Sequence, residues 1–114
     1  MSYAFVDIAT IPSLDEYDNP VHLGTGTLPL DADVVLLRPD DVVDSLYLTV
    51  PPGKDGQMIM ISAMDAVWNI NFESVPKSGT TFWIPTPGLN LRSGTAIHIL
   101  YVAPENRWYV VRCE

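Results

Sequence analysis

The sequence predicts an all-β fold, specifically an antiparallel β-sandwich or jelly-roll-like domain with an extended N-terminal arm. Its apolar runs are short, rich in Val, Ile and aromatic residues, and bounded by Pro, Gly, Asn or Asp, which is typical of strands. Turn signals recur about every eight to twelve residues, and no segment keeps a helical period beyond about two turns. Because parallel strands need long crossover connections, which such short loops do not supply, we expect antiparallel pairing.

The first element is the arm, which we assign to residues 1–30, with the β-sandwich domain at residues 31–114. The stretch from Asp7 to Pro29 holds three prolines, two glycines and isolated apolar residues. Prolines remove backbone donors and disfavour continuous sheet pairing, so such a segment lies along a surface and is anchored by single side chains. The arm residues expected to bind a partner or a neighbouring copy are Tyr3, Phe5, Ile8, Ile11, Leu14, Tyr17, Val21 and Leu23.

Eight strands are expected, each between turn signals. Tyr3–Ile8 is rich in aromatic and β-branched residues and is suited to adding a strand to an exposed sheet edge. Val34–Arg38 follows the arm, and Leu46–Val50 ends at a Pro-Pro-Gly turn. Between these two strands, residues 40–47 contain the start of a helical turn, but a tight loop is favoured there. Gln57–Ser62 begins after an Asp-Gly turn.

Four later strands are separated by turns that contain Pro, Gly or Asn, and they are Val67–Phe72, Thr80–Ile84, Thr95–Val102 and Arg107–Arg112. Alternation is clearest in Thr95–Val102, where Ile97, Ile99 and Tyr101 share one face. The other face carries Ala96, His98, Leu100 and Val102. Both faces are therefore mostly apolar, so this strand lies deep in a sandwich or turns one face toward a neighbouring subunit.

Acidic residues are concentrated in the first half of the chain. The 114 residues carry 14 acidic and 6 basic side chains, a formal net charge of −8. Residues 1–50 hold nine acidic residues against Arg38 alone, whereas residues 51–114 hold five of each sign. The net charge opposes a phosphate backbone, so nucleic-acid binding is not expected. The asymmetry fits either a solvated face or a docking surface for a basic partner.

No catalytic, metal-binding or cofactor-binding constellation is predicted. The two histidines, His22 in the arm and His98 in an apolar strand, leave a metal site or a nucleophile–histidine pair incomplete. The paired aspartates lack the spacing of an EF-hand loop, and no Gly-rich phosphate loop opens a helix. Cys113 is the single cysteine, so no intramolecular disulfide is expected. Because no catalytic constellation is found, we expect a non-enzymatic protein. The sequence shows neither a signal peptide nor a membrane-spanning run, so we expect it to be soluble.

Aromatic residues are the most informative side chains of the expected strands. Trp108 and Tyr109 are adjacent in one strand and therefore point to opposite sheet faces. Exposed tryptophan and tyrosine are enriched at binding hot spots, while packing in the core is the alternative for most of these residues. The aromatics expected at an interface or at a glycan-stacking surface are Trp68, Trp83, Trp108 and Tyr109.

The second half of the chain has a recognisable order of turns and strands. Residues 50–61 end one strand in Val-Pro-Pro-Gly and enter an alternating strand through a Gly-Gln step. The segments VWNINF at 67–72, LNLRSG at 89–94 and NRWYVV at 106–111 follow. This succession, over roughly residues 33–112, resembles the small β-sandwich domains of tailed-bacteriophage virion proteins, which occur in head decoration (cement) proteins and in trimeric knobs of head and tail fibres.

The resemblance implies a homotrimer that binds the major capsid protein on the outer surface of a phage head and stabilises contacts between capsid subunits. The expected location is the virion, after synthesis in the host cytoplasm, with no cofactor, nucleic acid or membrane involved. No shaft precedes the β domain in this chain, which favours a decoration protein over a fibre tip. The alternative is a fibre knob or a receptor- or carbohydrate-binding module that uses the tryptophans as stacking platforms.

Overall fold

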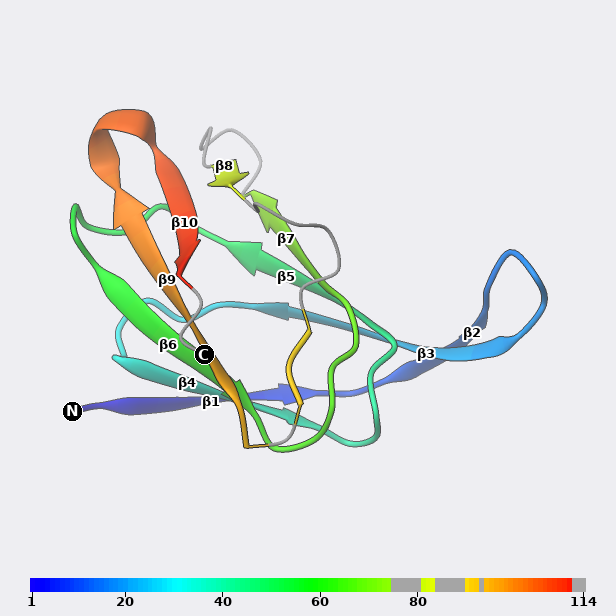
Figure 1. Cartoon of the computed structure of the whole chain (residues 1–114). Helices are drawn as coiled ribbons and strands as arrows, with labels where there is room; N and C mark the ends of the chain where they lie inside the picture. The colour runs from blue at the N-terminus through cyan, green and yellow to red at the C-terminus, as the bar shows by residue number, and fades with distance from the viewer. Residues whose placement is uncertain (75–80, 84–89, 93, 112–114) are drawn as a thin grey trace.

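The computed structural model is β-rich and has two mixed sheets (Figure 1). It describes residues 1–74, 81–83, 90–92 and 94–111. The six-stranded sheet has the order β1-β4-β6-β9-β10-β8, and the four-stranded sheet has the order β2-β3-β5-β7. The strands are β1 (Tyr3–Ile8), β2 (Ile11–Leu14), β3 (Pro20–Thr27), β4 (Val34–Pro39), β5 (Ser45–Val50), β6 (Met58–Ala63), β7 (Ile70–Ser74), β8 (Thr81–Trp83), β9 (Ala96–Val102) and β10 (Arg107–Val111). A short 3-10 helix, η1 (Ala103–Glu105), connects β9 to β10.

The prediction of a β-rich chain is confirmed, but the predicted antiparallel pairing is wrong for most of the described strand pairs. Five pairs are parallel, namely β1–β4, β4–β6, β3–β5, β5–β7 and β10–β8. Three pairs are antiparallel, namely β2–β3, β6–β9 and β9–β10. The chain alternates between the sheets from β3 to β7, so a strand of one sheet is the crossover between two parallel strands of the other. Short loops then suffice for parallel pairing, and no crossover helix is needed.

Strand positions agree better with the sequence prediction than strand directions do. The strand expected at Val67–Phe72 begins at Ile70, and Val67 forms only isolated bridges with Val43 and Leu91. β2 and β3 were not expected. Thr80, Ile84 and Arg112, the ends of two expected strands, lie outside the described residues.

One hydrophobic core contains side chains from both sheets. The prediction that Ile97, Ile99 and Tyr101 share a face of β9 is confirmed, because all three are buried. The core also contains every second residue of β4 and β6 of the six-stranded sheet and of β5 of the four-stranded sheet, which are Val35, Leu37, Leu46, Leu48, Val50, Ile59, Ile61 and Ala63. Because alternate residues point inward, the opposite side of the six-stranded sheet forms a second, outer face.

Trp108 is held in the core by the turn between β5 and β6. Its Nε1 donates a hydrogen bond to the carbonyl oxygen of Pro51 at 3.0 Å. Its ring packs edge-on against Tyr101, with ring centroids 5.0 Å apart. A Cβ at Gly53 would lie 2.8 Å from the Trp108 ring, so the close approach of this turn requires glycine. The Pro-Pro-Gly turn therefore closes the core over the tryptophan.

Residues 1–30, expected to form an arm, contain three strands that take part in both sheets. β1 pairs with β4 along its whole length, and β3 pairs with β5 from Leu23 to Thr27. The prolines do not prevent this pairing, because Pro20 starts β3 and Pro12 lies on the edge strand β2. Ile8 was expected to bind a partner, and this is corrected: it is 2% exposed, because every second residue of β1 faces the core.

Candidate functional site

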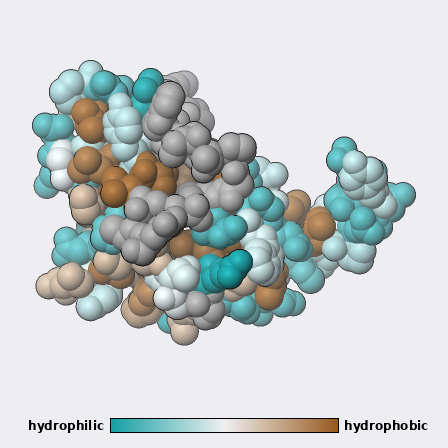
Figure 2. Space-filling model, viewed as in Figure 1, coloured by the Kyte–Doolittle hydropathy of each residue, from teal (hydrophilic) through white to brown (hydrophobic). Residues whose placement is uncertain are grey.

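The β2–β3 hairpin is the first candidate surface, and it extends away from the rest of the molecule (Figure 1). In its register Ile11 pairs with Leu23 and Leu14 pairs with Pro20, so Ile11 and Leu14 point to opposite faces. Ile11, Leu14 and Tyr17 are 60%, 62% and 76% exposed. Figure 2 shows hydrophilic residues gathered at the tip of the hairpin and hydrophobic residues nearer its base. The hairpin thus offers apolar contacts on both faces and a polar tip.

The tip of the hairpin is organised by Asp15. One carboxylate oxygen of Asp15 accepts hydrogen bonds from the backbone N–H groups of Tyr17 and Asn19, both at 2.8 Å. Asp18 adopts a left-handed backbone conformation with φ of 62°, which aspartate tolerates better than most residues. Glu16 and Asp18 add two further carboxylates to the tip. Tyr17 is consequently presented on a defined turn.

The base of the hairpin is fixed by two aspartates of the loop between β4 and β5. Asp40 accepts hydrogen bonds from the backbone N–H and the hydroxyl of Thr10, at 2.9 and 2.6 Å. Asp44 accepts a hydrogen bond from the backbone N–H of His22 at 2.6 Å, and its own N–H donates to the carbonyl of His22. These carboxylates therefore act as structural acceptors, which accounts for part of the acidity of the first half of the chain.

Three carboxylates of the first half have pKa values below their ordinary value of 3.8, because donors stabilise the ionised form. The largest contributions come from the N–H of Asn19 to Asp15, the N–H of Ser2 to Asp33 and the hydroxyl of Thr10 to Asp40. The unfolded chain takes up these protons at higher pH than the folded chain. The stability from these bonds is therefore present above about pH 3.8 and is lost as the pH falls through the lowered pKa values.

We accordingly expect the urea midpoint of unfolding to fall on acidification below about pH 4. Asp40→Asn is expected to flatten this fall, because an amide does not titrate. The measurement is a series of urea unfolding curves from about pH 7 to about pH 2 for the native chain and the variant. Asp41→Asn is the matched control, since within the described ranges the Asp41 carboxylate accepts a hydrogen bond only from the N–H of its neighbour Val42. Equal pH profiles for the native chain and Asp40→Asn would contradict the assignment.

The outer face of the six-stranded sheet is the second candidate surface. The strand registers place Tyr3, Val34, Met60, His98 and Val111 in one row across β1, β4, β6, β9 and β10. A second row contains Phe5, Leu36, Ser62 and Ala96, and a third contains Met58, Leu100 and Tyr109. The second apolar face of β9, noted from the sequence, therefore belongs to a broad surface formed by three rows of side chains, and most of these side chains are partly or fully exposed among the described residues.

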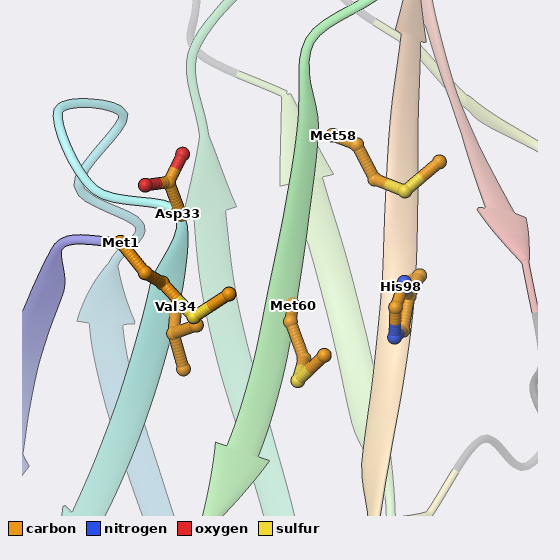
Figure 3. Close-up of a pocket in the computed structure, with 6 residues that line it drawn as sticks. All are labelled: Met1, Asp33, Val34, Met58, Met60 and His98. Atoms are coloured by element: carbon orange, nitrogen blue, oxygen red, sulfur yellow. The ribbon is translucent and has the colours of Figure 1, made fainter.

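A pocket of about 220 Å³ lies on this outer face (Figure 3). In Figure 3 the side chains of Val34, Met60 and His98 stand on three neighbouring strands, with those of Met1, Asp33 and Met58 around them. Its lining is mainly apolar, and its polar side chains are those of Asp33 and His98. Asp33 also accepts hydrogen bonds from the N–H and hydroxyl of Ser2, which fixes the N-terminus beside the pocket.

The four aromatics expected at an interface occupy different environments. Trp68 is 45% exposed, whereas the side chain of Trp83 lies outside the described residues. Trp108 is corrected: it is fully buried in the core, so it is neither an interface residue nor a stacking platform. Tyr109 is partly exposed on the outer face, and its hydroxyl donates a hydrogen bond to Glu105, whose carboxylate raises the pKa of Tyr109.

The other residues that were expected to bind a partner through the arm differ in exposure. Tyr3 and Phe5 are exposed, whereas Val21 and Leu23 are partly buried.

Sequence reasoning did not single out the methionines of the pocket. Met58 and Met60 are two residues apart in an alternating strand, and Met60 pairs with His98 of the strand whose second face is apolar. The alternating pattern of this strand could have indicated that the two methionines share a face, but only the register of β6 with β9 shows that they lie beside His98.

Among the described residues, no group of three or more His, Cys, Asp or Glu side chains is arranged to hold a metal ion. No helix in the described ranges is long and apolar enough to cross a membrane.

Comparisons with known proteins give little further information. No protein-family model matches the chain, and no curated protein matches it. A solved structure described as a chaperone-substrate complex is similar over 75% of this chain and 14% of the other chain, with 16% identity and a TM-score of 0.46. This chain therefore spans a small part of the length of that protein.

Proposed function

We propose that this chain is a non-enzymatic virion protein of a tailed bacteriophage, a decoration (cement) protein. It binds the major capsid protein on the outer surface of the head as a homotrimer and stabilises contacts between capsid subunits. The observation that carries the proposal is the β2–β3 hairpin, which holds apolar side chains and carboxylates away from the body of the chain. The order of turns that resembles virion β domains supports the class of partner.

The hairpin has the properties of a preformed docking element. A two-stranded hairpin is marginally stable by itself, but the hydrogen bonds from Asp40 and Asp44 fix this one at its base. A fixed binding element loses less conformational entropy on association. Because Ile11 and Leu14 point to opposite faces, the hairpin fits a groove between capsid subunits better than a flat surface. Full burial of each such side chain stabilises a contact by about 1.5–3 kcal/mol.

A trimer places three such hairpins on the lattice at once. Contacts that are weak singly add as avidity when one particle makes several of them. Because the trimer binds the assembled shell better than separated subunits, it stabilises the shell by mass action. Glu16 and Asp18 at the hairpin tip carry negative charge suited to basic groups on the capsid, which increases the rate of encounter at low salt.

The test replaces the exposed apolar residues of the hairpin and measures occupancy on capsids stripped of this protein. We expect Ile11→Ser/Leu14→Ser/Tyr17→Ser to lower the affinity for capsids by about tenfold or more while the chain stays folded. Tyr47→Ser is the matched control, because Tyr47 is exposed on β5 beside Thr25, in the part of β3 that does not pair with β2. Undiminished occupancy of the triple variant contradicts hairpin docking.

The charge of the tip is tested separately. In Glu16→Gln/Asp18→Asn the hairpin keeps its shape, since asparagine also tolerates the left-handed conformation at residue 18. We expect this variant to bind capsids more slowly and with a weaker dependence on salt concentration.

A carbohydrate- or receptor-binding module is the second candidate, favoured by the exposed ring of Trp68. It predicts binding on a glycan array that Trp68→Ala abolishes without loss of fold. Absence of glycan binding by the native chain contradicts this candidate and leaves capsid docking unaffected.

A further inference from the structure

We propose that the outer face of the six-stranded sheet binds a second copy of this chain, with Tyr3 of one copy seated in the pocket around Met60 and His98 of the other. The inference deepens the proposed function, since it assigns the contact between protomers. Only the expected number of copies in the assembly, which is three, depends on the proposed function.

The outer face has the composition of a protein interface, and its area approaches the size of one. The row from Tyr3 to Val111 crosses five strands, and His98 is its one polar residue. Five strands about 4.8 Å apart and about 20 Å long cover about 500 Å² of flat area. Projecting side chains and a pocket raise the accessible area further, toward the roughly 800 Å² per partner of a stable complex. Exposed apolar patches of a few hundred Å² or more mark interaction sites.

The charge of the outer face favours a second copy over a strongly charged partner. Asp7 and Arg38, at one end of the face, neutralise each other in an ion pair with an N–O distance of 2.8 Å. Arg38 also lies over the ring of Phe5, with its Cζ 4.4 Å from the ring centroid. The acidic tip of the hairpin and the aspartates of the β4–β5 loop are not members of the three apolar rows. Two copies can therefore meet through a nearly neutral surface despite a net charge of −8 each.

Tyr3 and the pocket match in size and chemistry. An apolar cavity of about 150 Å³ holds a benzene molecule, so a pocket of about 220 Å³ has room for the ring of a tyrosine. Tyr3 is 61% exposed, so most of its side chain is available for contact with another molecule. The methionine thioethers make favourable contacts with aromatic rings. The phenol hydroxyl of Tyr3 can reach a polar partner in Asp33 or His98 at the pocket wall.

The positions of Tyr3 and the pocket allow two copies to exchange these contacts. Tyr3 and Met60 lie in one row, two strand spacings or about 10 Å apart. A twofold axis in the plane of the face, running along β4 between them, places each Tyr3 opposite the pocket of the other copy. The same contact made in one direction only joins each copy to the next and can close as a ring of three.

The experiment is native mass spectrometry and analytical ultracentrifugation of the native chain up to about 100 μM, in the range of ordinary interface affinities. We expect a self-associated species. Tyr3→Ser and Met60→Lys are expected to raise its dissociation constant by about tenfold or more. Tyr17→Ser, which removes a more exposed tyrosine at the hairpin tip, is expected to leave the dissociation constant for self-association unchanged. Near-ultraviolet circular dichroism checks that each variant stays folded.

A second measurement locates the contact without relying on substitutions. Mixing a chain labelled at its methionine methyl groups with an unlabelled chain is expected to give intermolecular nuclear Overhauser effects from the Met60 methyl group to the Tyr3 ring. A monomer at all concentrations overturns the inference, as does association that neither Tyr3→Ser nor Met60→Lys weakens. A dimer supports the Tyr3 contact and contradicts the trimer of the proposed function, whereas a trimer supports both.

Discussion

Replacing Trp108 with alanine is expected to lower the free energy of unfolding by about 3–5 kcal/mol. The indole is fully buried in the core and packs edge-on against Tyr101. Alanine leaves a cavity beside Gly53, where the turn approaches the ring too closely for any side chain. It also removes the donor to the Pro51 carbonyl, which is then left without that hydrogen bond. Equilibrium unfolding in urea measures the loss.

Trp68→Ala is the matched control for this prediction. It removes the same atoms from a ring that is 45% exposed, so the expected loss is about 1 kcal/mol or less. Similar losses of unfolding free energy in the two variants would contradict the structure, in which Trp108 is buried and Trp68 is partly exposed.

Ile8→Ala is expected to lower the free energy of unfolding by about 2–5 kcal/mol. Ile8 is 2% exposed and packs on the backbone of β3, because its Cγ2 lies 2.6 Å from where a Cβ at Gly24 would be. The side chain therefore joins β1 of the six-stranded sheet to β3 of the four-stranded sheet. Urea unfolding again gives the measurement, with the slope checked for two-state behaviour.

Ile11→Ala is the control for Ile8, since Ile11 is 60% exposed on the hairpin. Its expected effect on stability is within about 0.5 kcal/mol, and its effect on capsid binding is expected to be the larger one. The opposite pattern, a stable Ile8→Ala chain that loses capsid binding, would place Ile8 in a docking surface and contradict its role in the core.

Alternation along a strand is local, and this is why strand positions were largely predictable from the sequence. Ile97, Ile99 and Tyr101 were assigned to one face from their spacing alone, and they are buried. The direction of pairing is not local, because it depends on where the chain goes between two strands. The short loops excluded parallel pairs only on the assumption that consecutive strands belong to one sheet. The alternation of β4, β5, β6 and β7 between two sheets removes that assumption.

The contacts of the acidic residues were not predictable from the sequence either, because they too depend on the fold. Composition revealed an excess of carboxylates in the first half of the chain, but it did not reveal the hydrogen-bond donors of Asp33 and Asp40, which lie about 30 residues away in sequence. Asp33 accepts from Ser2, and Asp40 accepts from Thr10. Trp68 and Trp108 could not be separated either, because the turn that covers Trp108 is 57 residues away along the chain. The pocket around Met60 depends on the registers of β4 with β6 and of β6 with β9, so the sequence did not predict this pocket either.

The number of copies per particle tests the proposed function most directly. The proposed function requires that a tailed phage encodes this chain, and the test is quantitative mass spectrometry of purified virions of that phage, with the major capsid protein as the internal reference. A decoration protein is expected in a fixed ratio to the capsid protein, on the order of hundreds of copies per head, since it occupies repeated lattice positions. Absence from the particles, or a few dozen copies or fewer, would contradict the decoration role.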